Sequence, residues 1–214
     1  MTFPTRQHHH LLRFVAAAVL LMGVVGRAHA FTATISTSNT RTLYLRVGDG
    51  GTNGAGFRNG GTLSTLGTIN AVTVAVPAAA VGNSTAQAMT GNGRATSDYD
   101  NYQFCNAGDT YIGGFFQYKA TSGSAVLSVQ SSTPLSDGAG NTIPFPQISW
   151  TSYGNGDAGA EPIPAGTFNG GTQTLANFPV NQWQESCHSF KYANASVPAA
   201  GTYTGRVTYT LTSP

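Results

Sequence analysis

The C-terminal stretch Tyr203-Thr204-Gly205-Arg206-Val207-Thr208-Tyr209-Thr210-Leu211-Thr212 decides the fold class. Apolar residues and glycine occupy its odd positions, and threonine or arginine occupies every even position. A period of two sends successive side chains to opposite faces of an extended chain. The stretch therefore predicts a half-buried β-strand whose apolar face carries Tyr203, Val207, Tyr209 and Leu211.

The same alternation recurs along the chain and predicts an all-β protein. Apolar faces are expected at Leu43, Leu45 and Val47, and again at positions 72, 74 and 76. Segments 111–120 and 125–131 flank a Thr-Ser-Gly-Ser turn and predict a β-hairpin. Further strands are expected over 147–153, 172–178, 183–192. About nine or ten short strands with Gly/Asn/Asp-rich turns between them favour a β-sandwich over a barrel.

The composition agrees with a single β-rich domain. Charged residues are 8% of the chain, against about 25% in an average globular protein. Gly, Thr, Ser and Asn fill the polar positions, which is unfavourable for helices. Since 40% of the residues are hydrophobic, a core can form and disorder is not expected. We expect one domain over residues 31–214.

Residues 1–30 have the pattern of a secretory signal peptide. Arg6 and Arg13 precede an apolar run over 14–25, and Ala28-His29-Ala30 closes the segment with the small-x-small pattern of a cleavage site. The alternative, a membrane anchor, needs about 20 apolar residues. We therefore expect export, and no membrane span after cleavage.

Cleavage would change the charge and histidine content. Three of the ten cations would leave, so seven cations would face eight carboxylates, which argues against nucleic acid as a partner. Four of the five histidines would also leave, so zinc enzymes become improbable. We expect no catalytic residue, no cofactor and no metal site. His188 then has no catalytic role, and its replacement by alanine is expected to leave the fold and any surface binding largely intact.

Cys105 and Cys187 are the only cysteines, and in an exported chain an even pair predicts one disulfide. The alternative is a reactive Cys187 beside His188. Neighbouring residues of a strand point to opposite faces, so these two side chains cannot easily act as nucleophile and base. We favour the disulfide.

Other polar and aromatic residues offer weaker candidates for chemistry. Asp157 and Glu161 share a Gly/Pro-rich loop, but nothing in the sequence fixes the separation that acid/base catalysis needs. Asp98-Tyr99-Asp100 with Asp109, or Asp137 with Asn141, could supply oxygen ligands for calcium, although neither spacing matches a calcium loop. Asx turns are the favoured interpretation. Trp150 and Trp183 could form a sugar platform if exposed, but core positions are favoured.

The C-terminal segment from Val197 to Leu211 resembles the closing strand of chaperone–usher pilus subunits, especially the archaic, spore-coat-U-like branch. The ending of that family has a Pro-x-Gly-x-Tyr-x-x-x-Val character, and the resemblance covers about fifteen residues, together with the leader and the Thr/Gly-rich composition. It implies an incomplete immunoglobulin-like sandwich, escorted by a periplasmic chaperone and an usher and completed by a strand from another pilus subunit. Such completion is β-augmentation at an open sheet edge.

The chain also departs from that family. Its subunits often carry a cysteine soon after an alternating donor segment, and this chain has none before Cys105. Phe31, Ala33 and Ile35 share one face of a possible donor segment over 31–37, but few of its residues are large and apolar.

Three classes of function follow from these observations. The first is an exported structural or adhesive surface protein, found in the periplasm and then at the cell surface, in a pilus or outside the cell. The second is a self-contained extracellular binding module, for example for carbohydrate. The third is a secreted hydrolase or another secreted enzyme.

Overall fold

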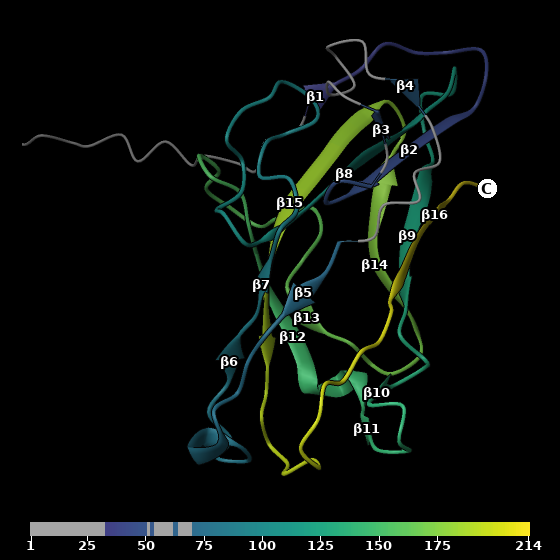
Figure 1. Cartoon of the computed structure of the whole chain (residues 1–214). Coiled ribbons are helices and arrows are strands. Elements are labelled where there is room, and N and C mark those ends of the chain that lie inside the picture. Colours follow the sequence, from purple (N-terminus) through teal and green to yellow (C-terminus); the bar gives the residue numbers. More distant parts are fainter. Residues whose placement is uncertain (1–32, 51, 54–61, 64–69) are drawn as a thin grey trace, which may run out of the picture.

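The computed structural model describes residues 33–50, 52–53, 62–63 and 70–214, and β-strands dominate them (Figure 1). The helical elements described are two short 3-10 turns, η2 (Ala78–Ala80) and η3 (Phe145–Gln147). The predicted all-β class is confirmed, and the strands form a sandwich of antiparallel sheets.

The first sheet is built around one long strand, β15 (Gln182–Tyr192). Its strand order is β13-β12-β15-β8-β2, and two further strands, β1 and β6, pair with the two ends of β15. The bounds of these strands are β13 (Gly166–Thr167), β12 (Ile148–Tyr153), β8 (Thr110–Gln117), β2 (Thr42–Val47), β1 (Ala33–Thr34) and β6 (Gln87–Ala88).

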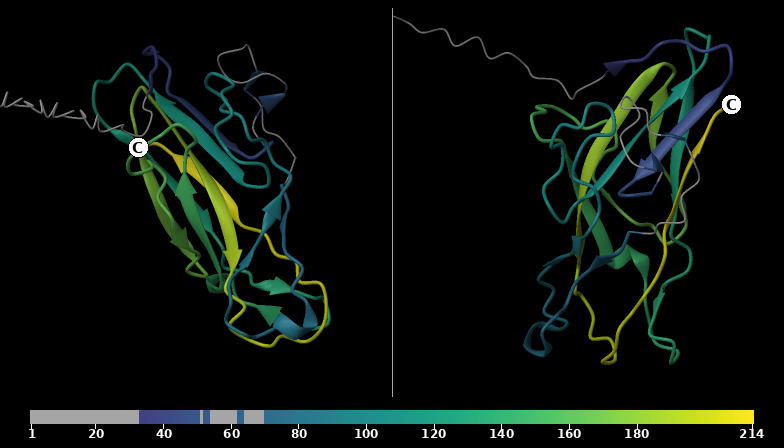
Figure 2. Two further views of the ribbon diagram at one scale, coloured as in Figure 1. Left: turned by 90° about the vertical axis from the view of Figure 1, so that its left-hand side faces the viewer. Right: turned by 45° about the horizontal axis from the view of Figure 1, so that its top comes forward.

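The second sheet has the order β14-β9-β16, with β14 (Thr172–Pro179), β9 (Ser124–Gln130) and β16 (Thr208–Thr212). The remaining strands form small two-stranded ladders: β10 (Leu135–Ser136) with β11 (Thr142–Ile143), β3 (Thr52–Asn53) with β4 (Thr62–Leu63), and β5 (Val72–Thr73) with β7 (Thr90–Gly91). Figure 2 shows the two main sheets as layers that face each other.

The main core lies between the two sheets. It contains Ile112 and Phe116 of β8, Leu127 and Val129 of β9, and Phe178 of β14, all less than 4% exposed. Burial of a large apolar side chain contributes about 1.5–3 kcal/mol, so this layer supplies most of the driving force for folding.

The outer face of the first sheet is also covered. Trp183 and Phe115 pack there against Tyr44 and Tyr99, and a second group joins Phe104 to the cysteine pair. The strands β8 and β15 are therefore buried on both faces, which is why their burial patterns are nearly continuous.

The predicted hairpin of 111–120 with 125–131 is wrong. Strand β8 pairs with β15 and β2, whereas β9 pairs with β14 and β16. The intervening segment crosses from one sheet to the other, so the apolar faces of β8 and β9 meet across the core. Asn181 holds this crossing, because its side chain accepts a hydrogen bond from the Tyr118 amide at 3.0 Å and donates one to the Ala120 carbonyl at 3.1 Å.

Two predicted strands are shorter than their sequence pattern. The strand expected from position 72 to 76 ends at Thr73, since its partner β7 has only two residues. The C-terminal strand begins at Thr208, because the chain before it bends onto β10, where Ser136 forms an isolated bridge with Thr204.

The predicted disulfide between Cys105 and Cys187 is confirmed, with a Cα–Cα distance of 5.5 Å and both residues fully buried. It attaches the loop that precedes β8 to the centre of β15. Phe104 and Tyr111 pack around it with their rings edge to face, 6.2 Å apart between centroids.

We predict that the double variant Cys105→Ser/Cys187→Ser is less stable than the native chain. In the chain-entropy account, closing an 82-residue separation contributes up to about 4.5 kcal/mol, and removal of native bridges commonly costs about 2–5 kcal/mol. Urea titration of both proteins checks this. An unchanged free energy of unfolding would show that the outer loop stays attached without the bridge.

Candidate functional site

One edge of the sandwich is open in the described structure. Strand β2 has a neighbouring strand, β8, on one side only, and β16 has β9 on one side only. The two strands belong to different sheets and lie beside each other (Figure 1). We use "open edge" for the apolar side chains of β2, of β16 and of the residue just before β16: Leu43, Leu45, Val47, Val207, Tyr209 and Leu211. All of them except Leu43 pack against the main core.

The side chains of the open edge are incompletely covered. Leu43 is 39% exposed, whereas Tyr44 and Arg46, on the opposite face of β2, are each only 3% exposed. The sequence alternation predicted that the leucine and valine face would be the buried one. The outer face of β2 is instead the more buried one, because other segments cover it. The inner face carries side chains of the open edge, which are only partly covered.

The C-terminal strand shows the predicted alternation. Tyr203, Val207, Tyr209 and Leu211 are partly buried, and the residues between them are exposed. In the ladder with β9, Tyr209 lies opposite Val129, and Leu211 lies opposite Leu127. The far side of β16 has no strand partner in the described residues, so its backbone donors and acceptors are available for another strand.

The segment proposed as a donor lies against its own chain. Phe31 falls outside the described residues, but Ala33 and Ile35 are 8% and 7% exposed. They pack on the outer aromatic group, and Ala33 lies opposite Trp183 in the β1–β15 ladder. Ala33 and Ile35 are therefore buried against their own sheet, and donation to another copy would first require this segment to leave β15.

A buried carboxylate organises the outer face of the first sheet. Glu185 is 2% exposed, and its Oε2 accepts hydrogen bonds from Tyr111 Oη at 2.6 Å, Ser97 Oγ at 2.8 Å and Trp183 Nε1 at 2.8 Å. Burial raises the pKa of Glu185, while these donors act in the opposite direction. Gly113 makes room for the network, because a Cβ there would lie 2.1 Å from Tyr111 Oη.

An ion pair extends this network to the neighbouring loop. Asp98 is fully buried, and its Oδ1 lies 3.2 Å from Arg46 Nη1 and 3.5 Å from Arg94 Nη1. The Asp98 amide also donates to Tyr111 Oη at 3.1 Å. The loop from Arg94 to Cys105 is thus held by charge, hydrogen bonds and the disulfide together.

Sequence reasoning missed Glu185 as an organising residue. A signal was present, because Trp183, Glu185 and Cys187 alternate on one face of the strand, and an acid between two residues of buried type indicates a paired, buried carboxylate. Its three donors come from positions 97, 111 and 183, and only the fold brings them together.

The other candidate residues occupy separate environments. Asp109 accepts a hydrogen bond from Tyr153 Oη at 2.6 Å, and Asp137 accepts from the side chain of Asn141 at 2.6 Å in an Asx-type turn. Within the described ranges, no three acidic, histidine or cysteine side chains are grouped as metal ligands. Asp157 and Glu161 lie near each other, and burial, followed by the charge of Asp157, raises the pKa of Glu161.

Both tryptophans and His188 are core residues. Trp150 and Trp183 are 4% and 0% exposed, so neither offers a sugar platform at the surface. His188 is fully buried and stacks on Trp150 with ring centroids 5.4 Å apart. This burial overturns the reasoning that His188→Ala would leave the fold intact, because alanine would leave a cavity there.

Comparisons with known proteins found no matching family model, no matching curated protein and no matching solved structure. Among the residues that the structure describes, no helix is both long and apolar enough to cross a bilayer.

We predict that His188 makes the protein sensitive to acid. Burial lowers its pKa from 6.5 to about 4, so the unfolded chain binds the extra proton between these values and the folded chain does not. Stability contributed by neutral His188 is present above pH 6.5 and is lost as the pH falls toward 4. The loss relative to His188→Gln should be about 3 kcal/mol at pH 4.

Urea titrations of both proteins between pH 4 and 7 measure this difference. The carboxylates with raised pKa are common to both proteins, so they cancel in the comparison. Parallel stability curves would contradict the assignment of a neutral buried imidazole.

Proposed function

We propose that the protein is an exported structural or adhesive subunit of a bacterial surface fibre, similar to pilus subunits, and that it assembles by β-strand donation. The observation that carries this proposal is the open edge, where two strands of different sheets lie side by side and each lacks a strand neighbour on its far side in the described residues.

The strand order supports the proposal. In an immunoglobulin-type sandwich, strands A, B, E and D form one sheet and C, F and G form the other. Taken in their order across the first sheet, β2, β8, β15 and β12 correspond to A, B, E and D, while β9 and β16 correspond to C and F, and β14 is an additional strand beside β9. The position of strand G, beside β16, is empty in the described residues. A strand placed there would cover the side chains of the open edge.

The physical chemistry of the open edge supports a strand as its partner. Exposed edges with apolar side chains tend to pair with another chain, and proteins usually protect them. An inserted strand would gain main-chain hydrogen bonds from β16 and would place alternate side chains against Val207, Tyr209 and Leu211. In this proposal a periplasmic chaperone covers the edge first, and an usher exchanges the chaperone for another subunit.

The N-terminal segment remains the proposed donor. In the described residues it is held to β15 by two ladder positions, with further hydrogen bonds from the Ile35 backbone amide to the Asn181 carbonyl at 3.0 Å and from the Gln117 side chain to the Ser36 carbonyl at 2.5 Å. Such a short attachment can open without disruption of the main core. The signal-type leader and the disulfide are both consistent with an oxidising compartment.

We predict that Val207→Asp abolishes incorporation into fibres, whereas Arg206→Asp is mild. Val207 packs against the main core at the open edge, so a carboxylate there would be desolvated without a partner. Arg206 is exposed on the other face and serves as the matched control. Periplasmic yield and surface incorporation, measured by immunoblotting, check the pair. Equal behaviour of the two variants would count against the open edge as an assembly surface.

We also predict that the mature chain expressed alone in the periplasm is recovered poorly or aggregated, and that a chaperone rescues it. Deletion of residues 31–37 should abolish polymerisation and leave chaperone binding intact, because the open edge is retained. Yield and oligomeric state by size-exclusion chromatography provide the measurement. A stable, soluble monomer obtained without any chaperone would be falsifying evidence, and a self-contained binding module would then be the better description.

A further inference from the structure

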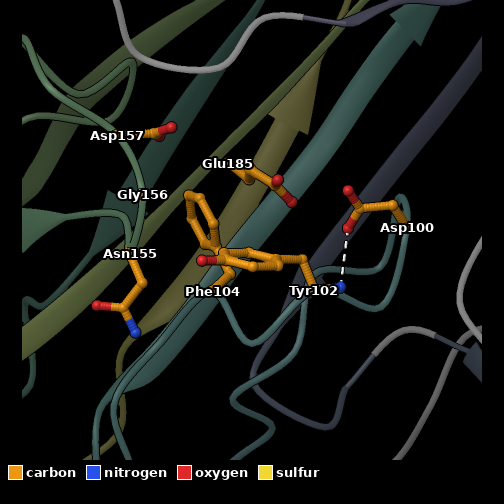
Figure 3. A pocket seen from close by; sticks show the side chains of 7 residues that line it. All are labelled: Asp100, Tyr102, Phe104, Asn155, Gly156, Asp157 and Glu185. Carbon is orange, nitrogen blue, oxygen red and sulfur yellow. Dashed lines mark hydrogen bonds between the residues drawn. The ribbon is translucent and has the colours of Figure 1, made fainter. Parts of the chain in front are cut away.

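A pocket opens on the outer face of the first sheet, separate from the open edge (Figure 3). Its volume is about 270 Å³. Its walls are two loops, one carrying Asp100, Tyr102 and Phe104 and the other carrying Asn155 and Asp157, and Glu185 of β15 lines it as well. Nothing in the sequence pattern predicted that these residues lie together.

The walls of the pocket are fixed by contacts within the chain. The backbone N–H of Asn155 donates a hydrogen bond to the Phe104 carbonyl at 2.8 Å, and the backbone N–H of Tyr102 donates one to Asp100 Oδ1 at 2.9 Å. The disulfide at Cys105 anchors the first loop directly beside Phe104. A ligand would therefore meet a preformed site and would lose little affinity to loop ordering.

The lining of the pocket is negatively charged. Three carboxylates contribute to it, and no lysine or arginine is among its lining residues in the described chain. In Figure 3 the carboxylates of Asp100 and Glu185 point toward each other, and that of Asp157 points inward from the opposite wall. The nearby cations Arg46 and Arg94 are both engaged by Asp98, which lies outside the lining.

Glu185 gives an independent indication of a ligand. Its side chain is 98% buried, as its 2% exposure shows, and all three of its hydrogen bonds go to Oε2. None of these three bonds goes to its other oxygen, Oε1, and Glu185 borders the pocket. At the pocket, Oε1 can accept a hydrogen bond from a ligand. Without such a donor, burial raises the pKa of Glu185.

The aromatic residues restrict the kind of donor. The Tyr102 ring is 53% exposed and borders the pocket together with the buried ring of Phe104. Aromatic faces attract ammonium and guanidinium groups. In the described residues these carboxylates do not form a group of metal ligands. A larger cation with several N–H donors could contact carboxylates and a ring simultaneously.

We infer that this pocket binds an organic cation, an alkylammonium or guanidinium group, with Asp100, Asp157 and Glu185 accepting its hydrogen bonds and Tyr102 contacting its charge. The volume lies just below the roughly 300 Å³ at which ordinary ligand pockets begin, which suits one cationic side chain or a small free amine. The inference does not depend on strand donation, because the pocket and the open edge share no residue.

Binding is tested by calorimetry with the full chain and blocked amino acids as probes. Nα-acetyl-lysine N-methylamide and its arginine counterpart should bind saturably, while the norleucine counterpart, which has a similar shape and no charge, should bind at least tenfold more weakly. A free diamine, 1,5-diaminopentane, distinguishes the source of the cation. Stronger binding of the blocked amino acids indicates a protein side chain, and stronger binding of the diamine indicates a free amine.

Asp157→Asn and Asp100→Asn remove charge but keep an acceptor oxygen, and each should weaken cation binding about tenfold. Tyr102→Leu should weaken it about threefold. Asp49→Asn is the matched control, because Asp49 is exposed and does not line the pocket. Circular dichroism melting curves of each variant confirm that the fold is retained.

The proposal is overturned if neither cationic probe binds, if the norleucine probe binds as well as the lysine probe, or if both aspartate variants bind like the native chain. Preferential binding of a neutral sugar such as N-acetylglucosamine would also overturn it. A chain that fails to polymerise but still binds the cations would contradict only the assembly proposal.

Discussion

The burial of β15 on both faces is the constraint on which the rest of the structure depends. Its inner face contributes His188 and Phe190 to the layer between the sheets, and its outer face carries Trp183, Glu185 and Cys187. An outer face of this kind cannot meet water, so other parts of the chain have to cover it. The N-terminal segment and the loop that precedes β8 provide that cover.

The cover is held by interactions of different physical kinds. Apolar contacts hold Ala33 and Ile35, the disulfide holds Cys105, and the carboxylate of Glu185 collects three hydrogen bonds. A buried carboxylate is costly unless its oxygens are paired, so the network is also a source of specificity for the loop position. The pocket beside Glu185 is a consequence of this arrangement, because the same loop forms one of its walls.

The two proposed sites differ in how completely the fold surrounds them. The open edge is a place where burial is incomplete and a strand is missing from the sandwich pattern. The pocket, in contrast, has walls that are held by hydrogen bonds and by the disulfide. The two proposals are compatible with each other, because the pocket and the open edge share no residue.

The sequence by itself determined the class of the fold, the disulfide and the alternation of the C-terminal strand. These properties depend on local periodicity and on residue type, which are visible in the chain. Tertiary structure alone decided that β8 and β9 belong to different sheets, that Tyr44 is more buried than Leu43, and that Glu185 lies at a pocket. The physical reason is that alternation specifies two faces of a strand, whereas the segments that cover each face come from distant parts of the chain.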